Sequence, residues 1–288
     1  MPIVNVGGCK IFSTISRAYQ RGRNGPKLFA MLESYFDDSS DRDRERYYAC
    51  GGLMGLRENW DWFCGRWCYE RKAAGLSDDE PFRATDCECG HGVFKDWPKE
   101  KRDSLMATLV SLVRDMQLYG FAAIIPIDLY KKYFPMGTGH QAFLIVAQQA
   151  IMNMAFIANN KPTPDDITVW FEDGPRTSGV KSRYDAVKQS SWPSARRLYG
   201  LTFADKKCLP LQSADLVARE AFKHIENFGE RPTRIPIRRL NDRLCFLMWT
   251  EEALVYLAEN GGPDNIELLS TWEESSDRPR FRRFWRNF

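Results

Sequence analysis

A short apolar segment, MLESYFDDSS at Met31–Ser40, runs directly into two carboxylates and then into a turn of small residues. It predicts a β-strand that ends at Asp37 and Asp38. Adjacent acids at the end of a strand suit a divalent metal, because the sheet fixes the backbone and the turn leaves the carboxylate oxygens open to solvent. Asp and Ser are also ordinary residues of hairpin turns. This segment alone therefore leaves a metal site and a plain turn as alternatives.

Strand-length and helical segments alternate after this first strand. Further strands are predicted at residues 47–54, 81–86, 121–127, 167–174 and 200–204. Helices are predicted at residues 59–74, 98–120, 141–158, 209–225 and 250–259, with a loop rich in Lys, Arg and Ser at 175–194. This order predicts an α/β domain with a mixed sheet of five or six strands between Leu32 and Ala204, flanked by helices.

The distribution of charge suggests three parts of the chain. Residues 1–30 form a basic N-terminal extension without acids, residues 31–228 the main domain, and residues 229–288 a C-terminal appendage packed on it. Near the C-terminus, arginines alternate with aromatic residues over 278–286. This pattern suits phosphate contacts and base stacking, and equally a tail docked on its own domain. The net charge of +3 adds little about partners.

No apolar run approaches the roughly 20 residues that a membrane-spanning helix needs. The N-terminus has no apolar core of a signal peptide, so we expect a cytoplasmic protein with no membrane partner. The sequence does not specify an oligomeric state.

Four cysteines, Cys64, Cys68, Cys87 and Cys89, lie close enough to His91 in the chain to raise the question of zinc. Their C-x3-C and C-x-C spacings differ from the C-x2-C knuckles of structural zinc sites, which argues against zinc. The alternative is a set of half-buried small hydrophobic side chains.

Acids recur at three separate elements of the predicted fold. Asp37 ends the first strand, Glu172 and Asp173 end a later strand, and Asp215 lies on a helix with a broad apolar face. An Asp in so apolar a setting is costly to bury unless it is paired or bound to a metal, although it could also face solvent at the helix rim. Such acids suit a two-metal site, in which two Mg²⁺ or Mn²⁺ ions clamp the attacking and leaving oxygens of a phosphodiester.

Four segments resemble, in order, the landmarks of the family catalogued as domain of unknown function 3800. They are YFDDSS at 35–40, FRATD…GVFKDW at 82–97, FEDG at 171–174 and DKK…PLQSADLVA at 205–218. The resemblance covers residues 32–225 and leaves both ends of the chain outside. That family is grouped with the ribonuclease H-like fold, whose nucleases hold two metals with an acid on the first strand and another on the last helix.

The resemblance implies a set of metal ligands. Asp37 would be the first-strand ligand, Glu172 or Asp173 the mid-chain ligand, and Asp215 the last-helix ligand. The chain departs from the family at three points. Asp38 replaces a Glu, the acids at 172 and 173 stand in reversed order, and Arg83 replaces a histidine. The role of Asp38 is thereby left open, and Asp86 becomes a candidate fourth contact.

Basic residues near these acids are candidates for substrate binding. Lys206 and Lys207 could hold the scissile phosphate, although an exposed, solvated lysine pair is the common alternative. Arg176, Lys181 and Arg183 in the predicted loop could guide a nucleic-acid strand.

The sequence predicts a metal-dependent nuclease that hydrolyses phosphodiester bonds of DNA or RNA with two Mg²⁺ or Mn²⁺ ions. The motifs of a P-loop NTPase, of a dinucleotide-binding enzyme and of a G-x-S-x-G hydrolase are absent from it. One alternative is a nucleic-acid or protein interaction module that keeps the fold without the chemistry. Members of the family tend to be bacterial or carried by phages, which suggests phage defence or counter-defence for such a module. Another alternative is a zinc-stabilised structural protein.

Overall fold

The computed structural model of the chain describes residues 31–41, 46–160, 165–228, 230–240, 243–260, 262 and 281–283. The basic extension predicted at residues 1–30 lies outside the described residues. So does most of the arginine- and aromatic-rich tail at 278–286.

A mixed seven-stranded sheet runs through the middle of the molecule in the order β5-β4-β1-β2-β3-β6-β7. Its strands are β1 (Met31–Ser40), β2 (Tyr47–Leu56), β3 (Tyr119–Pro126), β4 (Asp166–Glu172), β5 (Leu198–Ala204), β6 (Leu244–Trp249) and β7 (Phe281–Arg283). The first three strands form an antiparallel meander. β4 pairs in parallel with the other side of β1, and β5 pairs in parallel with β4. β1 is therefore an interior strand with a neighbour on each side, and the predicted α/β fold with a mixed sheet is confirmed.

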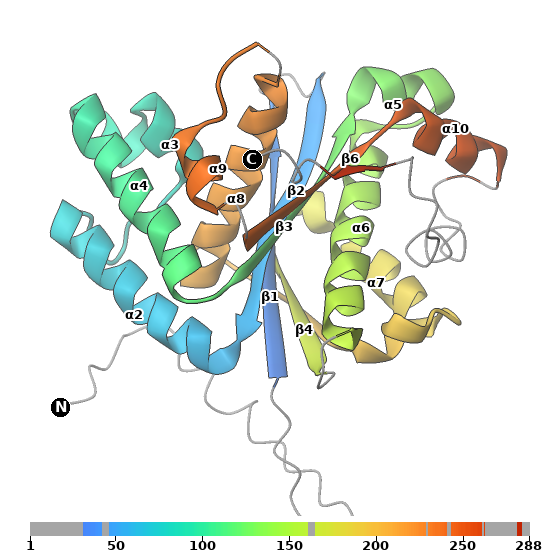
Figure 1. The fold of residues 1–288 in the computed structure, drawn as a ribbon, viewed down its shortest axis with the longest axis horizontal. Helices are drawn as coiled ribbons and strands as arrows, with labels where there is room; N and C mark the ends of the chain where they lie inside the picture. Colours follow the sequence, from blue (N-terminus) through green and yellow to red (C-terminus); the bar gives the residue numbers. More distant parts are fainter. Residues whose placement is uncertain are drawn as a thin grey trace, which may run out of the picture.

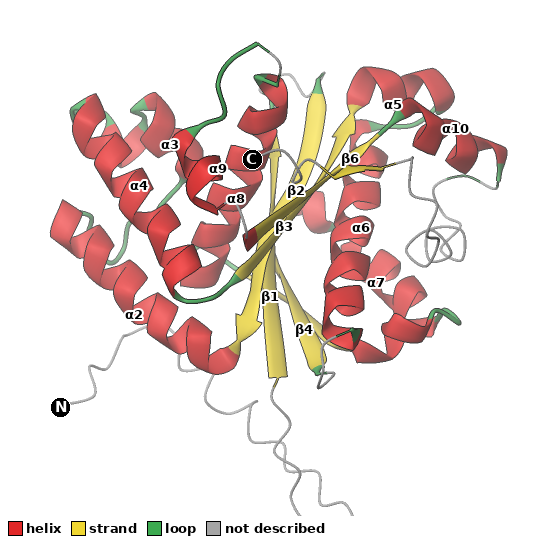
Figure 2. Cartoon of the chain, in the orientation of Figure 1, coloured by secondary structure: helices red, strands yellow, loops and turns green. Residues whose placement is uncertain are grey.

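Helices cover both faces of the sheet (Figure 1). One face carries α2 (Arg57–Ala74), α3 (Ala84–Cys89), α4 (Lys99–Asp115), α8 (Leu209–Glu226) and α9 (Ile235–Leu240). The other carries α5 (Ile127–Tyr133), α6 (Gly139–Asn159), α7 (Val180–Gln189) and α10 (Glu251–Glu259). Figure 2 shows the resulting three layers, with the strands between two groups of helices. Each face has its own apolar core, here called the α8-side core and the α6-side core.

The segment at 81–86 was predicted as a strand, and this is wrong. It leads into α3, which begins at Ala84. The backbone N–H of Ala84 donates a hydrogen bond of 2.8 Å to Oδ2 of Asp215. A carboxylate at a helix N-terminus satisfies a donor that has no partner within the helix. The helix start thus depends on a residue 131 positions away in the chain.

The predicted loop at 175–194 is also corrected, because it contains α7. Val180, Tyr184 and Val187 lie at helical spacing along α7 and are buried in the α6-side core. This apolar stripe indicates a helix, and the prediction of a loop missed it because the segment is rich in basic residues.

The segment after residue 228 contributes to the main sheet. β6 pairs in parallel with β3 and carries Phe246 in the α8-side core and Leu247 in the α6-side core. The predicted helix at 250–259 is confirmed as α10. The C-terminal appendage is therefore continuous with the sheet of the main domain over its described part.

Among the described residues one helix, α6, is long and apolar enough by length and composition to cross a membrane. Most of that helix is buried against the sheet and its neighbours, as in the core helix of a globular domain. The cytoplasmic location remains a prediction.

Candidate functional site

Three of the predicted acids meet around one lysine at the ends of the central strands. Asp37 lies within β1, Glu172 is the last residue of β4, and Asp215 lies in the second turn of α8. The prediction that the first strand ends at Asp37 and Asp38 and turns at the serines is wrong, because β1 stays paired with β2 up to Ser40. The Nζ of Lys206, in the turn after β5, donates hydrogen bonds to Oδ2 of Asp37 and, at 2.8 Å, to Oε2 of Glu172. We call these four residues the carboxylate cluster. The carboxyl ends of parallel strands are where α/β domains place their ligand sites.

Alternation along the strands decides which acids join the carboxylate cluster. Tyr35 of β1 faces the α8-side core, so Asp37, two residues later, points to the same face. Phe36 faces the α6-side core, and Asp38 follows it to that opposite face. On β4, Trp170 faces the α8-side core and Glu172 follows it. The pairs Asp37–Asp38 and Glu172–Asp173 are thus split by the pleat of the sheet.

A glycine on β2 allows α8 to reach Asp37. Gly51 is the residue paired with Asp37 across the β1–β2 ladder. A Cβ on Gly51 would lie 2.6 Å from Cα of Ala218, so the helix backbone rests directly on the strand backbone. Asp215 precedes Ala218 by three residues and therefore lies on the same face of α8. This close contact brings Asp215 over the end of β1.

Asp215 is 9% exposed, which excludes the alternative of a solvent-facing Asp at the helix rim. Its Oδ2 accepts the hydrogen bond from the N–H of Ala84. The first turn of α3 therefore fixes the orientation of this carboxylate.

Lys206 is held by its own backbone as well as by its side chain. Its carbonyl oxygen accepts a hydrogen bond of 3.0 Å from Nε2 of Gln212, a buried residue in the first turns of α8. The Oε1 of Gln212 in turn accepts from Nε1 of Trp67 at 3.2 Å and from the N–H of Phe82 at 3.1 Å. The alternative of an exposed lysine pair is wrong for Lys206, whose side chain is 12% exposed, while Lys207 is exposed.

Burial makes the carboxylate cluster electrostatically strained. Burial raises the pKa of Asp37 well above its usual value, Lys206 opposes this, and the negative charges of Asp215 and Glu172 add to it. Burial likewise raises the pKa of Asp215, against the effect of Lys206. For Lys206, burial lowers the pKa, but the surrounding carboxylates outweigh it, so that the pKa of the ammonium is raised. The cluster thus has more negative than positive charge.

The other predicted acids, Asp38, Asp86 and Asp173, do not belong to the carboxylate cluster. The N–H of Asp38 donates to Oδ1 of Asp37 at 2.8 Å, so Asp38 orients its neighbour through the backbone. Asp173 is exposed, and its N–H donates to the carbonyl of Ala204 at 2.8 Å. Asp86 lies on α3 with its carboxylate against Gly92. Neither Asp86 nor Asp173 is joined to the carboxylate cluster by a hydrogen bond or ion pair within the described residues.

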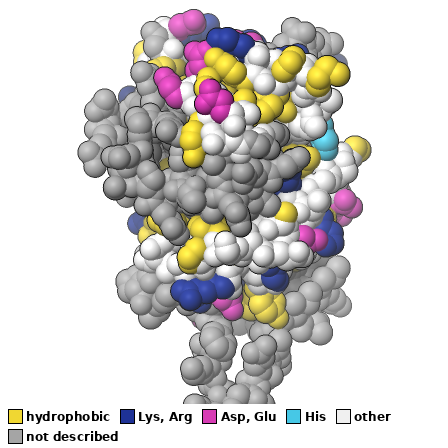
Figure 3. All heavy atoms as spheres, turned by 90° about the vertical axis from the view of Figure 1, so that its right-hand side faces the viewer, with side chains coloured by type: hydrophobic (Ala, Val, Ile, Leu, Met, Phe, Trp, Pro, Cys, Tyr) yellow, Lys and Arg dark blue, Asp and Glu magenta, His cyan; other side chains and the backbone are white. Residues whose placement is uncertain are grey.

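The three basic residues predicted to guide a nucleic-acid strand do not share one loop. Lys181 and Arg183 are on α7, and Lys181 pairs with Asp185 of the same helix. Arg176 lies in the short 3₁₀ turn Pro175–Thr177. Figure 3 views the molecule from the right-hand side of Figure 1, and on this face described Lys and Arg side chains are scattered among acidic and apolar ones. Guidance of a strand by these three residues stays a prediction.

The four cysteines lie on two helices and have other neighbours. Cys68 on α2 donates from Sγ to Oδ1 of Asp78 at 3.7 Å, and Cys87 on α3 donates to the carbonyl of Arg102 at the same distance. Within the part of the chain that the structure describes, no three or more His, Cys, Asp or Glu side chains form a preformed metal site. That statement includes the carboxylate cluster, where Lys206 lies between Asp37 and Glu172.

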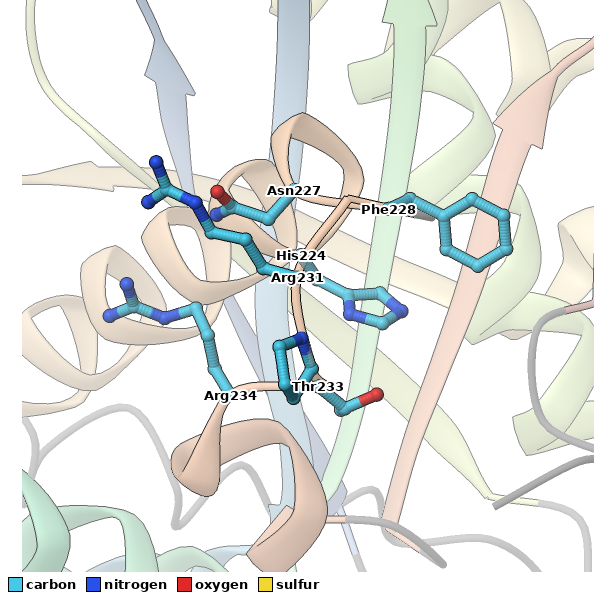
Figure 4. Close-up of a pocket in the computed structure, with 7 residues that line it drawn as sticks. His224, Asn227, Phe228, Arg231, Thr233 and Arg234 are labelled. Atoms are coloured by element: carbon cyan, nitrogen blue, oxygen red, sulfur yellow. The ribbon is translucent and has the colours of Figure 1, made fainter.

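A hollow lies between the end of α8 and the start of α9. It is lined by His224, Asn227, Phe228, Arg231, Pro232, Thr233 and Arg234. Figure 4 shows the arginine side chains extending to one side and the rings of His224 and Phe228 to the other. The guanidinium of Arg234 is bonded to Glu220 and Glu88. These side chains do not converge on a common point, and the hollow is about 13 Å along α8 from Asp215 at the usual rise per residue.

Comparisons with protein-family models, with curated proteins and with solved structures find no match for this chain.

The site residues that the sequence did not single out act through packing and hydrogen bonding. Gly51 gives α8 its close approach, Gln212 holds the turn of Lys206, and Ala84 binds Asp215 through its backbone. Gln212 carries a usable signal, because it precedes Asp215 by three residues on a predicted helix and so shares its face. The role of Ala84 has no side-chain signal at all.

Proposed function

We propose that this chain is a metal-dependent nuclease of ribonuclease H-like fold that hydrolyses phosphodiester bonds of DNA or RNA. The observation that carries the proposal is the convergence of Asp37, Glu172 and Asp215 from a first strand, a later strand and a late helix. These are the elements that the resemblance to the domain of unknown function 3800 family implies for its metal ligands. Fold alone would not establish an activity, so the proposal rests on this site.

The sheet supports the fold part of the proposal. Its first three strands form an antiparallel meander, and β4 and β5 add in parallel on the other side of β1. This is the strand arrangement expected of a ribonuclease H-like domain. The first-strand acid lies on an interior strand of this sheet, with α8 across the α8-side face.

The chemistry of the donor set fits a hard divalent cation. Carboxylate oxygens are the ligands that Mg²⁺ and Mn²⁺ prefer. The second oxygens of Glu172 and Asp215, Oε1 and Oδ1, accept no hydrogen bond from the described residues. A cation there would also relieve the repulsion that helps to raise the pKa values of Asp37 and Asp215.

Each part of the site has a role in this proposal. Asp37, Glu172 and Asp215 would hold the metal, which when bound supplies an activated water and stabilises the charge on the phosphate. Lys206 keeps Asp37 and Glu172 close together and opposes the rise in the pKa of Asp37. The exposed Lys207 is next to the cluster in the chain and can contact a phosphate of the nucleic-acid backbone.

One observation favours a second candidate, an interaction module without catalysis. Lys206 already pairs with two of the three acids, which is also how a purely structural ion-pair cluster would look. In that case the chain would bind nucleic acid or protein and cleave nothing.

Cleavage assays separate the two candidates. Single- and double-stranded DNA and RNA are incubated with Mn²⁺ and wild type, Asp37→Asn or Asp215→Asn. We expect cleavage of at least one substrate by wild type and its loss in both variants. The pair Glu172→Gln and Asp173→Asn serves as a matched comparison, in which only Glu172→Gln should reduce the rate. Binding without cleavage under all conditions would favour the module, and cleavage that survives both Asp substitutions would refute the site.

A further inference from the structure

We infer that the ammonium of Lys206 is a fixed second cation of the carboxylate cluster, so that the site takes one divalent ion and not two. The inference rests on the proposed function and changes its metal count. It concerns a residue of the chain itself, and binding of a metal ion alone can test it.

The position of Lys206 is fixed by contacts of both its side chain and its backbone. Its Nζ bridges Asp37 and Glu172, and only 12% of its side chain is exposed. Its carbonyl is bonded to the buried Gln212, whose amide oxygen is held by Trp67 and Phe82. A lysine that merely fills an empty site would keep a free backbone and a large rotamer entropy. Removal of this side chain from the cluster would break two ion pairs at a turn that α2 and α8 fix.

The hydrogen bonds of the three carboxylates indicate which oxygens a further cation would use. Oδ1 of Asp37 accepts from the N–H of Asp38 and Oδ2 from Lys206, so both oxygens of this central carboxylate already accept a hydrogen bond. The oxygens without such a bond belong to Glu172 and Asp215. An incoming ion can therefore bind Glu172 and Asp215 through these oxygens, and Asp37 through a lone pair that neither hydrogen bond uses, while Lys206 stays on Asp37.

The net charge of the cluster also favours a single divalent ion. Carboxylates that bind a metal ion are ionised, so three carboxylates and one ammonium would carry two negative charges in the metal-bound site, which a single Mg²⁺ or Mn²⁺ neutralises. In two-metal sites the ions lie about 3.5–4 Å apart and share a carboxylate. Here an ammonium already bridges two carboxylates. A second divalent ion would face its repulsion in a buried setting where charges are weakly screened.

Counting bound Mn²⁺ tests the inference directly. The full chain, freed of metal, is titrated with Mn²⁺ alone, and the bound ions are counted by calorimetry and by the electron paramagnetic resonance signal of free Mn²⁺. Lys206→Met removes the charge and keeps a similar length, and Lys207→Met is the matched control at the exposed neighbour. We expect one ion per chain for wild type and Lys207→Met, and two for Lys206→Met.

Two results would overturn the inference while leaving a nuclease in place. They are two ions per wild-type chain together with Mn²⁺-dependent cleavage, or a single ion of unchanged affinity in Lys206→Met. A wild type that binds no Mn²⁺ and cleaves no nucleic acid would instead remove the proposed function. If Lys206→Met does not fold, the Mn²⁺ dependence of the wild-type cleavage rate decides, with a Hill coefficient near one expected and a value near two against the inference.

Discussion

The two halves of α8 carry two clusters of charged side chains that differ in their balance of acids and cations. The N-terminal half contributes Asp215 to the carboxylate cluster. The C-terminal half contributes Arg219 and Glu220, which pair with Glu88 of α3 and with Arg234 before α9. We call this second group the ion-pair cluster. Both clusters connect α3 to α8, but only the ion-pair cluster has equal numbers of acids and cations.

The ion-pair cluster is electrostatically complete. Arg234 donates to both oxygens of Glu220, each at 2.8 Å, and Glu88 accepts from Arg219 and Arg234. Burial raises the pKa of Glu88, but the two guanidinium groups outweigh it and leave that pKa lowered. The pKa of Asp37 shifts in the opposite direction, because its side chain is 3% exposed against 23% for Glu88 and because it shares Lys206 with two other acids. Glu220, whose side chain is 1% exposed, likewise has a pKa raised by burial, which Arg234 opposes.

The difference teaches that burial of charge alone does not mark a functional site. A buried cluster with matched partners can serve to orient helices. A buried cluster that lacks counter-charge is unfavourable on its own and is completed by a ligand, which is how perturbed pKa values indicate candidate sites. The predictions below separate the two clusters by activity and by stability.

The largest effect is expected from Asp215→Asn. An Asn can still accept from the N–H of Ala84, so the fold is kept while the proposed metal ligand is weakened. We expect Mn²⁺-dependent cleavage to fall by more than about 100-fold, beyond the usual effect of losing an outer-shell partner. Without metal, the free energy of unfolding should rise by about 1 kcal/mol, because one buried negative charge is removed. Initial rates and urea unfolding measure both, and unchanged cleavage would contradict the assignment.

Glu220→Gln should lower the stability of the fold and leave cleavage nearly unchanged, the opposite of Asp215→Asn. The side chain of Glu220 is 1% exposed, and its loss leaves Arg234 with Glu88 alone. We expect a loss of about 2–4 kcal/mol in the free energy of unfolding, since breaking a buried pair leaves a charge uncompensated. Cleavage by the folded protein should stay within a few-fold of wild type.

Asp103→Asn is the control for Glu220→Gln. It removes a solvent-exposed pair with Lys99 on α4, and such pairs contribute only about 0.3–0.5 kcal/mol. A Glu220→Gln variant as stable as this control would show that the ion-pair cluster does not hold the helices.

Gly51→Ala tests whether the carboxylate cluster depends on the close approach of α8. The new Cβ would lie 2.6 Å from Cα of Ala218, so strand or helix must shift. We expect a loss of about 1–3 kcal/mol in stability and a reduced cleavage rate. Gly65→Ala is the matched control, because its Cβ on α2 meets nothing within 4 Å. That control should gain about 0.5–1 kcal/mol from helix propensity.

The last prediction concerns the dependence of the free energy of unfolding on pH. Asp37 and Asp215 have raised pKa values in the folded chain, so above the unfolded value of about 3.9 the folded state binds more protons than the unfolded state. Their contribution to stability therefore falls as pH rises through this range, by at most about 1.4 kcal/mol per pH unit and proton. Lys206 stays charged there because its pKa is raised. Unfolding curves from pH 4 to 7 without metal should be steeper for wild type than for Asp215→Asn, and equal slopes would refute this.

Much of the fold is readable from the sequence because it follows from local periodicity. The strands at β1, β3, β4 and β5 and the helices α2, α4, α6 and α8 match predicted segments. The segments that were predicted wrongly depend on tertiary contacts or on a weak apolar stripe. α3 begins where Asp215 accepts from its backbone, and α7 shows only three buried apolar residues in a polar sequence.

By itself, the sequence determined which acids are candidates, and it left the role of Asp38 open. It could not decide between Glu172 and Asp173, nor whether Asp215 faces solvent. The tertiary structure shows that Glu172 joins the carboxylate cluster and that Asp215 is buried, and it alone set Lys206 between two acids, one of them 169 residues away. Local periodicity depends on neighbours in the chain, whereas charge pairing and the contact of α8 with Gly51 depend on distances that arise only when the sheet and helices pack.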